Sequence, residues 1–65
     1  MMKKYIIKDL IYNCYYLGGG EWTICRLCAQ QFNTREQAEQ TKKYILAVNK
    51  PIKKSDLKTI ETEGE

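Results

Sequence analysis

The chain has 65 residues and a net charge of +3, a size that allows one domain with a small hydrophobic core. Its composition, 43% hydrophobic and 29% charged residues, is that of a globular protein and argues against disorder. No apolar stretch approaches the ~20 residues of a membrane-spanning helix, and the basic N-terminus lacks the apolar run of a signal peptide. We therefore expect a cytoplasmic protein that does not associate with membranes.

The charge is unevenly distributed. Residues 1–58 hold all 11 Lys and Arg residues, whereas residues 59–65 hold only acidic charges. A basic body with an acidic tail favours an acidic partner, such as nucleic acid. The alternative is ordinary surface charge that keeps a small domain soluble.

The first 17 residues predict an antiparallel hairpin. Lys3 to Lys8 alternates in the way expected of a strand, and Cys14 to Leu17 is rich in the aromatic residues that favour sheets. Residues 9–13 form the predicted turn, in which Asn13 replaces glycine in a left-handed conformation.

The triple glycine Gly18–Gly20 predicts an abrupt end to the second strand. Trp22 is expected to cover one end of the core. Thr23 is a predicted N-cap for a short helix over residues 26–29, which places Ile24, Leu27 and Cys28 on one face.

The main helix is predicted from Arg35 to about Val48. Thr34 and Gln37 have the spacing of a capping box, and Glu39 can pair with Lys42 or Lys43 on the exposed side. One buried stripe follows the helical period through Ala38, Thr41, Ile45 and Val48. Tyr44 and Leu46 lie off that stripe, and their exposure would indicate a homodimer seam or a partner groove.

Residues 52–60 are compatible with a third strand or with a short helix capped by Ser55, and residues 61–65 are expected to be a frayed tail. The predicted fold class is α+β, with a small antiparallel hairpin or three-stranded sheet packed on one main helix. This β-β-α domain is assigned to residues 1–50 and a partly flexible extension to residues 51–65.

Five segments carry a wider pattern of strand ends, tryptophan and capped helix: Tyr5–Asp9, Tyr15–Gly18, Trp22–Thr23, Ala29–Phe32 and Thr34–Ala38. With this pattern the chain resembles short proteins of bacteriophages and prophages over roughly residues 4–48. The resemblance implies a β-β-α domain, encoded by a phage and acting in the host cytoplasm. Some phage proteins of this size inhibit host defence systems, so the resemblance also implies a host or defence protein as partner.

The chain contains three cysteines and no histidine. Cys25 and Cys28 have a spacing used by zinc sites and by redox pairs, and Cys14 is a third potential ligand. The fourth ligand would have to be an acidic side chain, water or a second chain. The alternative, which we favour, is that Cys28 and Cys14 are small buried residues, with no metal and no cofactor bound.

We find no catalytic constellation and expect a non-catalytic module that works by protein–protein interaction. A homodimer is one form of that interaction. Nucleic-acid binding through Lys3, Lys4, Lys8, Arg26 and the lysines of residues 42–58 is a second hypothesis, and a zinc or thiol module is a third. The candidate partner-binding residues are Tyr12, Tyr15, Tyr16, Trp22, Arg26, Tyr44, Lys4 and Lys8.

Overall fold

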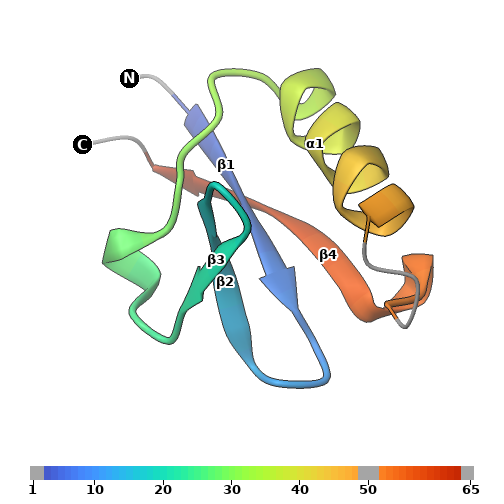
Figure 1. Cartoon of the computed structure of the whole chain (residues 1–65). Helices are drawn as coiled ribbons and strands as arrows, with labels where there is room; N and C mark the ends of the chain where they lie inside the picture. The colour runs from blue at the N-terminus through green and yellow to red at the C-terminus, as the bar shows by residue number, and fades with distance from the viewer. Residues whose placement is uncertain (1–2, 49–51, 64–65) are drawn as a thin grey trace.

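A four-stranded antiparallel sheet carries one main helix. The computed structural model describes residues 3–48 and 52–63. The strand order is β3-β2-β1-β4, and the helix packs on one face of the sheet, over β1 and β4 (Figure 1). In chain order the elements are β1 (Lys3–Asp9), β2 (Cys14–Gly18), β3 (Glu21–Thr23), the 3₁₀ helix η1 (Arg26–Cys28), α1 (Arg35–Val48), the 3₁₀ helix η2 (Lys54–Asp56) and β4 (Leu57–Glu63). The predicted α+β class is confirmed.

The predicted hairpin of β1 and β2 is confirmed, with Asp9 opposite Cys14. The carboxylate of Asp9 accepts hydrogen bonds from the backbone N–H groups of Ile11 and Tyr12, at 2.8 and 3.2 Å. Asn13 has a φ of 56°, the left-handed conformation expected for it. A side chain therefore closes the turn that joins the two strands.

The chain reverses direction at the triple glycine. Gly18, Gly19 and Gly20 have φ angles of 114°, 59° and 81°, which L-residues with a Cβ rarely adopt. The strand that follows, β3, was not predicted as a strand. It pairs with β2 after a register shift, with Trp22 opposite Tyr16.

The predicted short helix is a single 3₁₀ turn, η1. Cys25 is its N-cap residue, so the prediction that Thr23 caps it is wrong. The Thr23 hydroxyl instead accepts a hydrogen bond from the Cys25 N–H, at 3.1 Å. Ile24 and Leu27 are 85% and 86% exposed, so the apolar face of this turn does not join the core.

The start of α1 follows from local sequence. The Gln37 N–H donates to the Thr34 hydroxyl at 3.1 Å, as the capping box predicts. The Gln37 side chain, however, accepts from the N–H of Asn33 rather than from that of Thr34. The bounds of the helix agree with the prediction.

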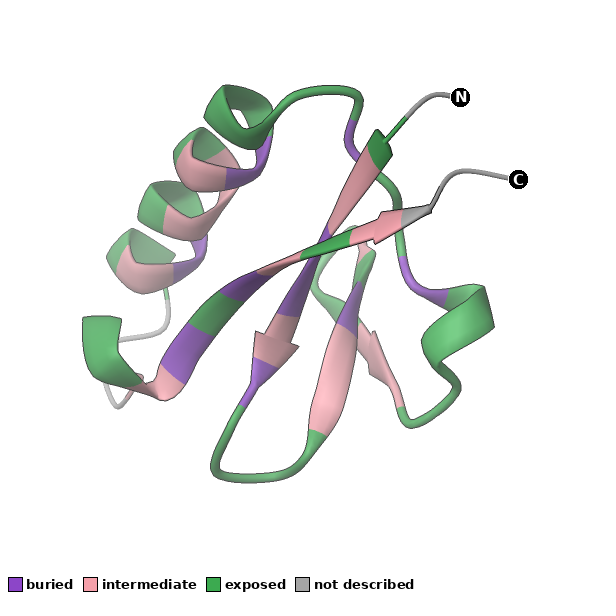
Figure 2. Ribbon diagram, turned by 180° about the vertical axis from the view of Figure 1, so that it is seen from behind, coloured by how far each residue is buried: buried purple, intermediate pink, exposed green. Residues whose placement is uncertain are grey.

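The buried stripe of α1 is shorter than predicted. Ala38 and Ile45 are 0% and 1% exposed, but Val48 is 58% exposed, so its assignment to the core is wrong. Figure 2 shows the buried positions of α1 on the side that faces the sheet. The main core cluster consists of Ile7, Tyr16, Phe32, Ala38, Ile45 and Leu57.

The last strand completes the sheet. β4 pairs with β1 along its whole length, from Lys3 opposite Glu63 to Asp9 opposite Leu57. Residues 61–63 therefore belong to a strand, in contrast to the expected frayed tail, and Ser55 lies within η2 without capping it. The domain boundary predicted at residue 50 lies outside the described residues.

Candidate functional site: an aromatic groove beside the helix

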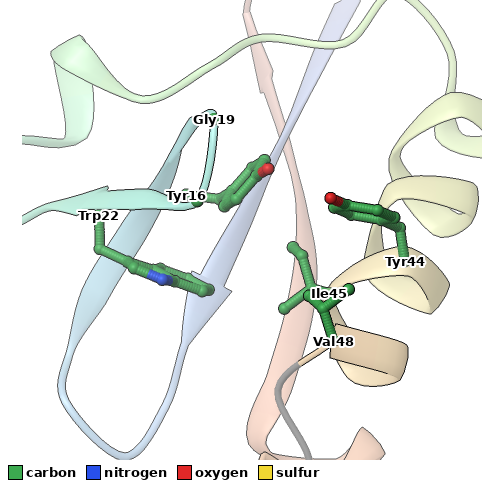
Figure 3. Close-up of a pocket in the computed structure, with 7 residues that line it drawn as sticks. Tyr16, Gly19, Trp22, Tyr44, Ile45 and Val48 are labelled. Carbon is green, nitrogen blue, oxygen red and sulfur yellow. The ribbon is translucent and has the colours of Figure 1, made fainter.

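Because α1 packs over β1 and β4, it leaves the β2–β3 side of the same face uncovered. A groove of about 390 Å³ lies between this side and the C-terminal half of the helix (Figure 3). It is lined by Tyr16, Gly19, Gly20, Trp22, Tyr44, Ile45 and Val48. The groove is the product of a sheet that is wider than its helix.

One wall is an aromatic pair on neighbouring strands. The rings of Tyr16 and Trp22 meet edge to face, with centroids 5.4 Å apart and planes at 71°. Register explains the contact, because directly opposite residues of antiparallel strands place their side chains on the same face. This geometry is favourable for aromatic rings and holds the wall in position.

The other wall comes from α1. Tyr44 and Val48 are one helical turn apart and therefore share a face, with Ile45 at the buried base. Tyr44 is 61% exposed, so the groove opens to solvent along this side.

The walls also carry hydrogen-bond donors. The hydroxyls of Tyr16 and Tyr44 point toward one another across the groove (Figure 3), and Trp22 adds an indole N–H. No described residue forms a hydrogen bond with these three side chains. The groove thus offers apolar surface together with donors that are free for a ligand.

A basic and aromatic row crosses the opposite face of the sheet. Lys58, Lys8 and Tyr15 occupy directly paired positions on β4, β1 and β2, and the ammonium of Lys8 lies 5.7 Å from the centre of the Tyr15 ring. Two lysines directly opposite one another repel. Lys4 shares this face, and its ammonium donates a hydrogen bond to the side chain of Asn33.

The structure separates the predicted partner-binding residues into distinct places. Tyr16, Trp22 and Tyr44 line the groove, whereas Lys4, Lys8 and Tyr15 are on the opposite face. Tyr12 is exposed at the tip of the hairpin and Arg26 is exposed in η1.

Sequence reasoning missed part of the groove. Val48 was assigned to the core because it continues the helical period. Only the position of α1 on the sheet shows that Val48 is exposed and lines the groove instead. Of the two helix residues named for a homodimer seam or a partner groove, Tyr44 is exposed and Leu46 packs partly against the core.

Two of the three cysteines are exposed. Cys25 and Cys28 are both accessible free thiols and Cys14 is half-buried, so the prediction that Cys28 is buried is wrong. Burial, with a contribution from Asp9, raises the pKa of the Cys14 thiol. The three cysteines do not form one cluster, since no group of three or more His, Cys, Asp or Glu side chains suited to a metal occurs among residues 3–48 and 52–63.

Comparison with known proteins finds no matching family model, curated protein or solved structure. Within the described residues, no helix is both long and apolar enough to cross a bilayer.

Proposed function

We propose that this protein is a non-catalytic binding module that holds an extended segment of a partner protein in the groove. The observation that carries the proposal is the grouping of Trp22 with the exposed Tyr44 and Val48 around one hollow. Trp and Tyr residues that line a pocket are the side chains that contribute most to protein–protein binding.

The shape of the groove favours a peptide segment over a small molecule. Small-molecule sites have volumes of ~300–1,000 Å³ and enclose most of the ligand, whereas this groove is at the lower end of that range and has one exposed wall. An extended segment can lie across an open groove and insert one apolar side chain. Its backbone carbonyls would accept hydrogen bonds from the hydroxyls of Tyr16 and Tyr44 and the indole of Trp22, as in aromatic grooves that bind extended peptides.

The source of the segment follows from the sequence resemblance. Some short phage proteins inhibit host defence systems, so we expect the partner to be a host protein, with defence proteins as the first group to test.

A random peptide library selected on the purified protein tests the groove. Selected peptides should change the fluorescence of Trp22, which is the only tryptophan of the chain. Val48→Arg places a charge on the exposed wall and should weaken binding at least about tenfold, a loss of ~1.4 kcal/mol. Tyr12→Ala, at the hairpin tip outside the groove, is the matched control.

Peptides that bind the Val48→Arg variant as tightly as they bind the parent protein would place the binding site elsewhere. A library that yields no binder at all would remove the support for peptide recognition.

The second candidate function is nucleic-acid binding through the opposite face. Lys58 and Lys8 lie side by side at a cost in stability, which a phosphate between them would relieve, and Tyr15 next to them offers a ring for base stacking. Labelled single-stranded DNA and RNA should bind at low salt and dissociate as salt rises. Lys8→Gln and Lys58→Gln should each weaken binding, and a lack of binding at low salt would refute this function.

A further inference from the structure

The η1 turn lies on the side of the molecule remote from α1 (Figures 1 and 2), and Cys25 and Cys28 are its N-cap and its last residue. The Cys28 N–H donates to the Cys25 carbonyl at 3.0 Å, which closes a tight turn over the two intervening residues. The turn therefore keeps the two cysteines near one another in space, and both thiols are free and exposed.

We propose that Cys25 and Cys28 from two copies of the chain bind one zinc ion and join the copies in a two-fold dimer. Structural zinc takes four ligands in a tetrahedron, and C-x-x-C supplies two of them. A two-fold axis through the metal doubles each ligand of one chain. Two identical turns thus complete a four-thiolate site that one turn leaves half-filled. This inference is independent of the groove and of the function proposed for it.

The charge of the site also balances. Four thiolates around a divalent ion leave two excess negative charges, and Arg26 lies between the two cysteines of each turn. Arg26 forms no ion pair with any other described residue. Two copies of this arginine would neutralise the excess without any further partner.

Exposed apolar residues next to the thiols favour a second copy as the source of the missing ligands. Ile24 and Leu27 precede the two cysteines directly and are almost fully exposed. A dimer centred on the metal would bring these side chains against their own counterparts, because a two-fold interface pairs the same surface of both chains. Removing them from water would add to the free energy of metal binding.

Native mass spectrometry of the reduced protein with added Zn²⁺ tests the proposal. The expected species is a dimer with one zinc ion. The Cys25→Ser/Cys28→Ser variant should remain a zinc-free monomer, with circular dichroism confirming its fold. Cys14→Ser, which removes the thiol outside the pair, should behave as the parent chain.

Co²⁺ in place of zinc gives a second readout. A site of four sulfurs should show intense thiolate-to-cobalt absorption at one cobalt per two chains. A monomer with one zinc, a chain that binds no zinc, or a dimer that persists in chelator but separates in reductant would each overturn the proposal, the last because it indicates a disulfide.

Discussion

Asp9 shows how much of the hairpin depends on one side chain. Its carboxylate is buried and accepts hydrogen bonds from two backbone N–H groups of the turn. Asp9→Ala leaves those donors without their acceptor and should lower the free energy of unfolding by about 1.5–3 kcal/mol. Asp9→Asn keeps one acceptor and should cost less. Urea denaturation measures both, and equal losses for the two variants would argue against this role.

Glu39 and Thr59 couple the helix to the sheet. The Thr59 hydroxyl donates to the Glu39 carboxylate at 2.6 Å. This hydrogen bond, with a smaller contribution from Lys42, holds the pKa of Glu39 below its ordinary value of 4.5. Between this lowered pKa and pH 4.5, Glu39 binds more protons in the unfolded chain than in the folded protein. The stabilisation from the Thr59–Glu39 hydrogen bond is therefore complete above pH 4.5 and is lost as the pH falls through the pKa of the folded protein.

Thr59→Val should consequently raise the pKa of Glu39 and destabilise the protein at neutral pH, by about 0.5 kcal/mol because the Glu39 carboxylate is partly exposed to water. The difference from the parent protein should shrink in acid. Denaturation at several pH values and an NMR titration of Glu39 measure it. Thr62→Val, whose hydroxyl donates to the Lys4 carbonyl, is the control, and its effect should not depend on pH.

At the scale of one element, α1 divides into a part that packs in the core and a part that faces the groove. Ile45 is enclosed by the core, whereas Val48, less than one turn later, faces the groove. Ile45→Ala should destabilise the protein by about 2–5 kcal/mol, and Val48→Ala by less than ~0.5 kcal/mol. Thermal denaturation distinguishes the two variants. A large loss of stability for Val48→Ala would mean that Val48 contributes to the core in spite of its exposure.

Local signals made the helix and the hairpin predictable. The capping pair Thr34 and Gln37 and the turn residues Asp9 and Asn13 act within a few positions of one another, so sequence alone contains their partners. β3 is three residues long, with Trp22 as its only strongly apolar residue, and gives too short a pattern to recognise.

The groove could be predicted only in part, for a different reason. Tyr16, Trp22 and Tyr44 were candidates by residue type, but their grouping depends on where α1 lies across the sheet. The exposed thiol of Cys28 was missed because free cysteines are usually buried. The grouping of the groove residues and the exposure of Cys28 both depend on how the elements pack together, which no local sequence pattern contains.

At the scale of the whole molecule, the sheet and the core both depend on β4. It pairs with every residue of β1 and contributes Leu57 to the core. A chain ending after Asp56 should therefore lose the cooperative fold rather than a flexible appendage. Circular dichroism and denaturation of that truncated chain measure this, and retention of a sigmoidal transition would show that residues 57–63 are dispensable.

The pairing of the first strand with the last also sets the order of events on the ribosome. β1 leaves the exit tunnel before its main partner β4, which emerges only after the elements between the two strands have been made. Until then Ile6 and Ile7 lack the strand that borders them in the finished sheet. The ladder between β1 and β4 can therefore form only after residues 57–63 have been synthesised, and in that interval β1 is exposed to chaperones and to aggregation with other nascent chains.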